Sequence, residues 1–182
     1  MDQDNFNTRL SIEEVIRNIS AKARLTVIED FIQEPLSLSE EEIEDSIRKM
    51  LEDGNNHDIK VIEGKKERYF YSEKYITPNY AAILEKIEDG NLLELIASTV
   101  RHESKVYPRP TEGKLFYKAP FNFSKEGLSQ VLEQMKLNEA YQDIKEVVAS
   151  NKALYLYSSQ FMSQVYAKSL VQWIEVDQYE TP

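Results

Sequence analysis

A group of basic and aromatic side chains between residues 60 and 75 has the composition of a nucleic-acid contact. It comprises Lys60, Lys65, Lys66, Arg68 and Lys74, interleaved with Tyr69, Phe70, Tyr71 and Tyr75. Lysine and arginine bind phosphate, and aromatic rings stack on bases. The alternative, which we favour, is a solvated β-hairpin whose lysines protect an edge strand and whose tyrosines alternate between core and surface.

A second segment, KVYPRPTEGKLFYKAPFNF at residues 105–123, has the composition of a protein interface. Exposed aromatic side chains beside arginine are typical of interface hot spots. The candidate interface residues are Tyr107, Arg109, Tyr117 and Phe121. The alternative is that this segment is structural, with Phe116 in the core and the prolines marking the start of a helix; the sequence leaves both open.

The residues do not indicate catalysis or a metal site. His57 precedes Asp58 and His102 precedes Glu103, but adjacent side chains point in different directions and neither pair is a ready chelate. The sequence contains no cysteine, no glycine-rich phosphate loop and no GxSxG motif. We therefore expect a non-enzymatic protein without metal or cofactor.

Composition predicts a globular, acidic protein of the cytoplasm. The 182 residues are 41% hydrophobic and 30% charged, and the absence of cysteine fits a reducing compartment. We expect neither a signal peptide nor a membrane span. The net charge of -10 is concentrated in residues 1–90, which hold 12 Lys and Arg against 21 Asp and Glu, and this acidity disfavours nucleic acid.

The chain repeats itself with an offset of 85 residues. With one single-residue insertion, 16 of 64 aligned positions are identical, where about 4 are expected by chance. The string DIK, for example, occurs at residues 58–60 and again at 143–145. We infer an internal duplication in which Ser39 superposes on Ser124 and Tyr71 on Tyr157.

The same elements are predicted in each copy. Apolar residues recur at helical spacing over 12–19 and 25–32. A third helix begins at Ser39, which forms a capping box with Glu42, and stops at Gly54; its equivalent begins at Ser124, and we place Pro110 in the first turn of the preceding helix.

A β-hairpin and a closing helix then follow in each copy. The hairpins cover 58–72, with Gly64 in the turn, and 143–158. The closing helices begin at Thr77, before Pro78, and at Ser163. The apolar stripes predict that the following residues are buried: Phe31, Ile47, Phe116, Leu132 and Trp173.

Three helices, a basic hairpin and a further helix resemble the winged helix-turn-helix superfamily over residues 24–75 and 109–161. The stretch SLSEEEIEDSIRKMLEDG resembles its recognition helix. The chain departs from the pattern because it lacks a clear first strand and has NNHD after the third helix. The resemblance implies that the third helix would enter the DNA major groove. Its first turn is acidic here, whereas the second copy offers Asn122, Ser124, Lys125 and Gln130.

The sequence therefore predicts a mainly α protein with small β-hairpins (α+β), built of two tandem winged-helix-like modules at 1–90 and 91–182. We expect a non-enzymatic adaptor or regulator that binds a protein partner or itself and binds no membrane. The alternative is a DNA-binding transcriptional regulator. The residues for nucleic-acid or partner contact would be Lys60, Lys65, Lys66, Arg68 and Lys125.

Overall fold

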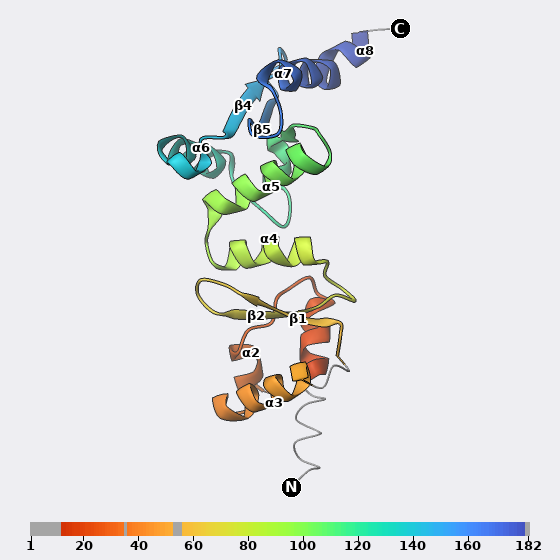
Figure 1. Cartoon of the computed structure of the whole chain (residues 1–182), viewed down its shortest axis with the longest axis vertical. Helices are drawn as coiled ribbons and strands as arrows, with labels where there is room; N and C mark the ends of the chain where they lie inside the picture. The colour runs from red at the N-terminus through yellow and green to blue at the C-terminus, as the bar shows by residue number, and fades with distance from the viewer. Residues whose placement is uncertain (1–11, 35, 53–55, 181–182) are drawn as a thin grey trace. The chain divides into compact units, whose positions relative to one another are not determined.

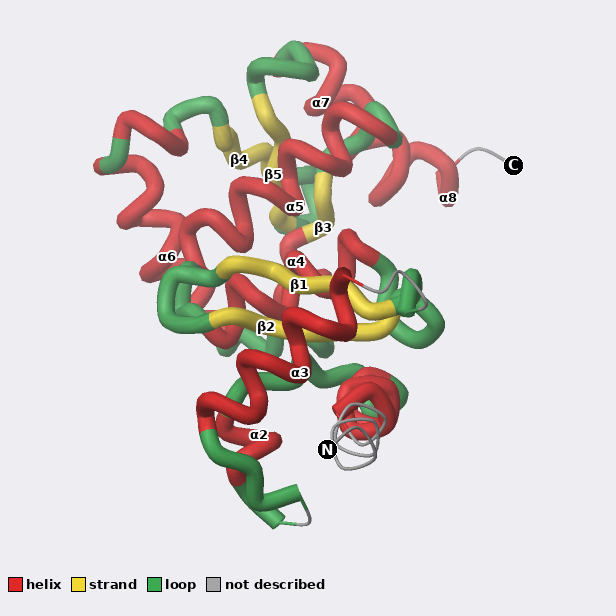
Figure 2. Tube along the Cα trace, turned by 60° about the horizontal axis from the view of Figure 1, so that its bottom comes forward, coloured by secondary structure: helices red, strands yellow, loops and turns green. Residues whose placement is uncertain are grey.

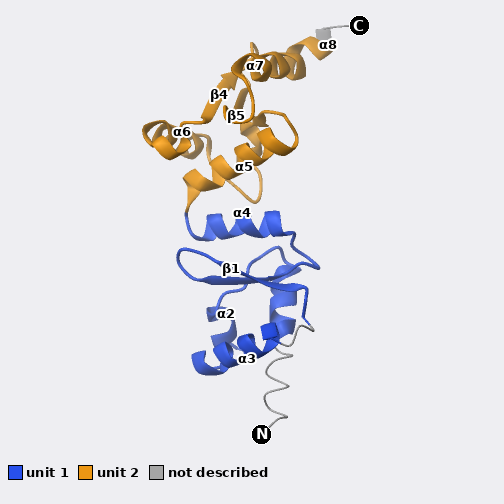
Figure 3. Cartoon of the chain, in the orientation of Figure 1, with its two compact units in different colours: residues 1–90 blue, residues 91–182 orange. Residues whose placement is uncertain are grey.

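The computed structural model describes residues 12–34, 36–52 and 56–180. The chain divides into two compact units, residues 1–90 (unit 1) and residues 91–182 (unit 2), which Figure 3 distinguishes by colour. Each unit has its own hydrophobic core. We describe each unit by itself.

Unit 1 consists of helices that surround a two-stranded sheet (Figure 1). A helix covers residues 12–20 and is followed by α2, Glu29–Ile32, and α3, Glu40–Glu52. The hairpin pairs β1, Ile59–Glu63, with β2, Arg68–Ser72. The unit closes with α4, Pro78–Glu88.

Unit 2 begins with α5, Leu92–Val106, and a short strand β3, Thr111–Glu112. The 3-10 helix η1, Gly113–Tyr117, and the helix α6, Lys125–Leu137, come next. After η2, Glu139–Tyr141, the strands β4, Ile144–Val148, and β5, Leu154–Ser158, form a sheet with strand order β3-β5-β4. The closing segment comprises α7, Gln164–Gln172, the π-helical turn η3, Trp173–Asp177, and α8, Gln178–Glu180.

The order of the elements is the same in both units, as the duplication requires. The hairpins also share their register, because Tyr71 lies opposite Lys60 and Tyr157 lies opposite Lys145. The extra residue of the second copy lies in the hairpin turn, which spans 64–67 in unit 1 and 149–153 in unit 2. The insertion therefore leaves the paired strands unchanged.

The predicted starts of the third and closing helices are confirmed in both units. The capping box is formed, since the Ser39 backbone N–H donates to Glu42 at 2.9 Å and the Glu42 N–H donates to Ser39 Oγ at 3.4 Å. Ser124 accepts from the Gly127 N–H at 2.9 Å, as an N-cap does. Thr77 and Ser163 cap the two closing helices in the same way. The predicted stop at Gly54 lies outside the described residues.

Two expectations about the segment after the first helix are wrong. Unit 2 has a first strand, β3, which pairs with β5, and unit 1 has a single bridge at the equivalent place, where Thr26 exchanges two backbone hydrogen bonds with Phe70 (2.9 and 2.8 Å). The second helix is also shorter than predicted: only one turn in α2 and a 3-10 helix in η1. Pro110 therefore precedes a strand and does not lie in a helical turn. The bridge at Thr26 and the two-residue strand β3 are too short to show a periodicity in the sequence.

Each hairpin is buried on both faces. In unit 1, Phe70 packs with the helices in one cluster, while Tyr69 and Tyr71 pack with Ile76 and Ala81 in another. The closing helix α4 supplies part of this second cluster. Figure 2 shows β1 and β2 running side by side in this unit. Our expectation that the tyrosines alternate between core and surface is wrong, because the closing helix covers the face that we took to be solvated.

Four of the five predicted core residues are buried: Phe31, Ile47, Phe116 and Leu132. The fifth prediction is wrong, because Trp173 is 54% exposed. Trp173 follows Tyr166 by seven residues, so regular helical spacing places it on the same exposed side, opposite the buried Ala167 and Val171. Val171 is fully buried and Ile174 lines a hollow beside Tyr155, so these two residues take the inward positions.

A partly buried polar network connects the first helix of unit 1 to its hairpin. The Arg17 guanidinium pairs with Asp58 at 2.9 Å, and Ser72 Oγ donates to the same carboxylate at 2.7 Å. The Ser72 backbone N–H donates to Ser20 Oγ at 3.0 Å. The hydrogen bond from Arg17 is the main reason why the pKa of Asp58 lies far below its usual range.

Unit 2 contains the same network with different residue numbers. Arg101 pairs with Asp143 at 2.6 Å, Ser158 Oγ donates to Asp143 at 2.7 Å, and the Ser158 N–H donates to Ser104 Oγ at 3.0 Å. Burial raises the pKa of Asp143, but the bonds from Arg101 and Ser158 outweigh burial, so the pKa lies below its ordinary value. The aspartate that opens each DIK string, Asp58 or Asp143, therefore helps to position the hairpin of its unit.

Gly64 is required by close packing in the hairpin turn. A Cβ at this position would lie 2.9 Å from the Glu67 carbonyl oxygen and would collide with the Tyr69 ring. The turn is closed by the Gly64 N–H, which donates to that carbonyl at 3.0 Å. Because Gly64 has no side chain, the buried Tyr69 ring can pack closely against the turn.

Candidate functional site

The basic side chains of the unit 1 hairpin lie beside carboxylates. Arg68, at the start of β2, pairs with Glu44 of α3. Lys60 of β1 lies 3.7 Å from Glu73, and Lys74 lies 3.5 Å from Asp58. A phosphate would have to displace these carboxylates, so the geometry reduces the attraction that the sequence predicted.

The hairpin turn is bound to the end of the closing helix. Asp89 accepts hydrogen bonds from the backbone N–H groups of Lys65 and Lys66, and from the Tyr69 hydroxyl at 2.8 Å. The Lys66 ammonium donates to the Glu88 carbonyl. Burial, followed by the bond to Asp89, raises the pKa of Tyr69, so its hydroxyl stays a donor. The turn is therefore held to α4 by both backbone and side-chain bonds.

The aromatic side chains of the hairpin are not available to stack on bases. Tyr69, Phe70 and Tyr71 are all buried, and only Tyr75, just past the strand, is exposed (56%). Base stacking, which we considered but did not favour for this hairpin, is therefore closed to these three rings. The hairpin lysines therefore lie around buried aromatic side chains and not beside exposed ones that could stack on bases.

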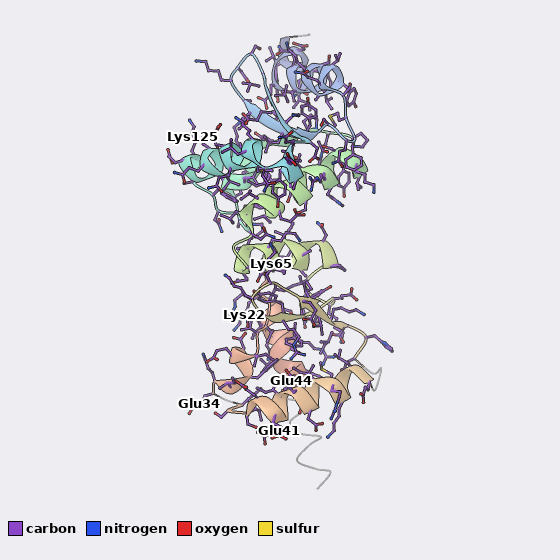
Figure 4. The ribbon with its side chains drawn as sticks, turned by 60° about the vertical axis from the view of Figure 1, so that its left-hand side comes forward. Lys22, Glu34, Glu41, Glu44, Lys65 and Lys125 are labelled. Atoms are coloured by element: carbon purple, nitrogen blue, oxygen red, sulfur yellow. The ribbon has the colours of Figure 1, made fainter. Side chains whose placement is uncertain are left out.

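The third helix of each unit presents a different surface. In unit 1, Glu41 and Glu44 lie on α3, and Lys65 belongs to the hairpin (Figure 4). In unit 2, Lys125 is exposed at the first position of α6 and lines a shallow depression with Glu126 and Gln130. Unit 1 is thus acidic where the resemblance would place DNA, and unit 2 is mixed in charge.

The candidate interface residues after α5 are divided between surface and core. Arg109 lies over the exposed Tyr107 ring at 5.1 Å and donates to Glu103 at 2.7 Å, which raises the pKa of Arg109. Tyr117 is exposed at the end of η1. Phe121 is half-buried and packs edge-on against the buried Phe116 with ring centroids 5.1 Å apart. Phe121 therefore contributes to the core, whereas Tyr107, Arg109 and Tyr117 are exposed.

An apolar surface that the sequence did not predict lies on the closing segment of unit 2. We define the outward face of α7 and η3 as Val165, Tyr166, Ser169 and Trp173. Val165 is 78% exposed, Tyr166 is 50% exposed, and Ser169 is also exposed. On the opposite side of α7, Ala167 and Val171 are fully buried in the core of unit 2. The helix is therefore apolar on two faces, and the core covers only one of them.

Exposed apolar side chains are concentrated in unit 2. Of the twelve exposed large hydrophobic residues in the part of the chain that the structure describes, ten belong to unit 2. Isolated exposed hydrophobics are ordinary, whereas a group on one helix is a feature of binding surfaces. The signal was present in the sequence as the seven-residue spacing of Tyr166 and Trp173, but we assigned Trp173 to the core.

Among the described residues, no three His, Asp or Glu side chains converge in a way that would hold a metal ion. His102 packs edge-on against Tyr107, and Asp58 is bound by Arg17. None of the described helices combines the length and apolar character that a membrane span requires.

Comparison with known proteins identifies the repeated unit. The family model described as the YdhW C-terminal domain matches residues 6–90 and again residues 89–179, which confirms the tandem duplication. The chain is 32% identical to a protein of Escherichia coli (strain K12) described as "Uncharacterized protein YdhW", over 171 residues that cover 94% of this chain and 80% of that protein. No solved structure shows a significant match. The chain therefore belongs to the YdhW C-terminal domain family and contains two copies of that domain.

Proposed function

We propose that this chain is a non-enzymatic protein-binding adaptor or regulator, built of two winged-helix-like modules, and that unit 2 contacts the partner. The order of elements supports the winged-helix-like description, since each unit has a helix, a short strand or bridge, two helices, a hairpin and a closing helix. In a winged-helix-like fold, the hairpin corresponds to the wing. The helices α3 and α6 then occupy the position of the recognition helix. Fold alone does not identify the partner.

The observation that carries the proposal is the exposure of Trp173 beside Tyr166 on a helix whose other side is core. Tryptophan and tyrosine are the residues most enriched at binding hot spots. Because each side chain is about half exposed, leaving the exposed half in water forgoes on the order of 1 kcal/mol of burial free energy for each. A partner surface that covers the outward face would recover part of this free energy.

Photo-crosslinking tests the proposal. We expect p-benzoylphenylalanine in place of Trp173 to form a discrete covalent adduct with a protein when the full chain is irradiated in cells of its source. The matched control places the same group at Tyr75, which is equally exposed but lies in unit 1. Equal labelling at the two positions, or no protein adduct at 173, would show that the outward face does not bind protein.

A DNA-binding regulator is the alternative function, and the cationic hairpin is the observation that favours it. We expect at most weak binding to a random duplex at low salt, with a slope of log affinity against log salt of about -2 to -3, because only three cations would contact phosphate. Replacing Lys65, Lys66 and Arg68 with alanine should abolish this binding in a fluorescence titration.

Two outcomes of that titration would change the assignment. A steep salt slope with high affinity would favour the regulator over the adaptor. Binding that is unchanged in the triple variant would move the contact to unit 2, where Lys125 begins α6. Absence of binding by the parent chain removes the main support for the regulator.

A further inference from the structure

We propose that the free edge of β4 in unit 2 binds an extended peptide segment of a partner protein as an added strand. One apolar side chain of the peptide enters a hollow between α6 and β4, and an acidic side chain lies beside Lys145. The outward face takes no part in this contact. The inference therefore goes beyond the proposed function and does not rest on it.

The strand β4 lies at the edge of its sheet. The strand order β3-β5-β4 gives β4 a neighbour on one side only. At one end of the hairpin, the Ser159 N–H donates to the Asp143 carbonyl at 2.7 Å. At the other end, the Ala149 N–H donates to the Ala153 carbonyl at 3.0 Å. Since bonded pairs alternate along an antiparallel ladder, three residues of β4 direct their N–H and C=O groups away from β5: Ile144, Glu146 and Val148.

These outward backbone groups are unpaired within residues 12–34, 36–52 and 56–180, the described part of the chain. Donors and acceptors that repeat every about 6.6 Å along a strand match the backbone of another extended chain. Unit 1 uses its first outward group differently, because the Ile59 N–H donates to the Asn56 carbonyl at 2.9 Å. The edge of β4 therefore offers one more free donor than the edge of β1.

A hollow of about 400 Å³ lies between α6 and β4. Three of its lining residues are buried and apolar: Leu132, Met135 and Leu156. Glu146 also lines the hollow and lies directly opposite Leu156 in the register, so this is the α6 face of the sheet. A strand added beyond β4 would place every second side chain on the same face. One apolar side chain of the peptide would therefore reach the hollow.

Lys145 provides a charge that a peptide can complement. Its side chain is exposed on the face opposite that of Glu146, and no described carboxylate pairs with its ammonium group. The equivalent Lys60 of unit 1 lies 3.7 Å from Glu73, and Lys136 on the α6 face lies 2.9 Å from Glu146. The residue next to the apolar one in the added strand would point to the side of Lys145. An acidic residue at that position forms a cross-strand ion pair.

Selection from phage-displayed random dodecamers tests the inference. The full chain is the bait, and Glu146→Pro is used for counter-selection. Proline at this position removes an outward N–H and leaves the bonds to β5 in place, as on natural edge strands. We expect enriched peptides in which apolar and acidic residues alternate, with dissociation constants on the order of 10 µM after synthesis. If no peptide binds the parent at least about tenfold better than Glu146→Pro, the inference is overturned.

Two further proline variants separate the edge from other effects. Val148→Pro keeps the ion pair between Glu146 and Lys136 and should lose peptide binding like Glu146→Pro. Glu63 is the equivalent of Val148 in unit 1, so Glu63→Pro is the matched control and should bind within about twofold of the parent. Far-UV circular dichroism and thermal unfolding establish that the three variants are folded.

Two measurements do not depend on proline. Lys145→Glu should weaken binding of a selected acidic peptide by at least about fivefold, and a peptide with lysine in place of its acidic residue should restore it. In the parent chain, the bound peptide should slow amide exchange at Glu146 and Val148. The amides of Lys145 and Val147 are already bonded to β5 and should change little. Unchanged exchange at Glu146 and Val148 in the complex would overturn strand addition.

The remaining outcomes also decide the inference. Peptide binding that survives both Glu146→Pro and Val148→Pro would place the contact elsewhere and overturn it. A parent chain that dimerises in sedimentation equilibrium, and becomes monomeric in Val148→Pro, would show that the occupant of the edge is a second copy and not a peptide of another protein. Crosslinking at position 173 reports on the outward face alone, so the proposed function is tested separately.

Discussion

Phe116→Ala is expected to lower the free energy of unfolding of unit 2 by about 4 kcal/mol, the range found when a large buried aromatic is removed from a core. Phe116 is fully buried, and Phe121 and Phe123 pack edge-on against its ring at centroid distances of 5.1 and 6.4 Å. Removing the ring leaves a cavity that two flanking aromatics on a short loop cannot fill without moving. The core of unit 2 would lose its central contact.

Urea unfolding followed by Trp173 fluorescence measures this change, because the chain's one tryptophan lies in unit 2. Tyr117→Ala is the matched control, since Tyr117 is the exposed neighbour of Phe116 and its removal should cost less than about 1 kcal/mol. A cost below about 1 kcal/mol for Phe116→Ala would mean that the ring does not pack as described. Phe31→Ala should leave the fluorescence transition in place, because Phe31 belongs to unit 1.

Asp143→Asn should destabilise unit 2 by about 2 kcal/mol at neutral pH, because it leaves the partly buried Arg101 guanidinium, 26% exposed, without its counter-charge. The substitution keeps the shape of the side chain but removes the charge that Arg101 pairs with at 2.6 Å. It also weakens the acceptor that Ser158 uses. Glu133→Gln, which removes an exposed partner of Lys136, should cost less than about 0.5 kcal/mol.

The pH dependence gives this prediction a second measurement. The pKa of Asp143 is lower in the folded unit than in the unfolded chain, so its contribution is fully present above the unfolded pKa of about 3.9 and is lost as the pH falls below it. The difference between the parent and Asp143→Asn should therefore be largest near pH 7 and should shrink below about pH 4. A difference that is constant down to pH 2 would exclude the charge as its cause.

The duplication supplies an internal control. Asp58→Asn breaks the equivalent pair with Arg17 in unit 1 and should be seen by circular dichroism, whereas the Trp173 transition should stay unchanged. An effect of Asp58→Asn on that transition would show that the two units do not unfold independently.

The sequence predicted those parts of the fold that local patterns determine. Ser39 and Glu42 form the expected capping box, and the DIK strings begin hairpins of identical register. The single bridge at Thr26 was missed because one paired residue has no periodicity. The core position of Trp173 was mistaken because Trp173 shares one helix side with Tyr166, and the spacing of apolar residues does not show which side the core covers.

The polar network was beyond prediction for a different reason. Arg17 and Asp58 are 41 residues apart, and their pairing depends on how the first helix packs against the hairpin. The repeat could have revealed it, but Arg17 and Arg101 are offset by 84 residues and not 85, so the alignment that began at Arg24 did not include them. The candidate site was missed similarly, since a helix that is apolar on two faces does not show which face the core covers.

The hairpin turns show where the two copies became different after duplication. In unit 1 the short side chain of Asp89 reaches the backbone of Lys65 and Lys66 directly. In unit 2 the turn is one residue longer, and the longer side chain of Glu175 accepts from the Asn151 side chain at 2.7 Å. Turn length and carboxylate length have thus changed together while the strands kept their register. The turn is therefore a position where each copy could diverge in surface chemistry without disturbing its own folding, as paralogous domains do when they specialise.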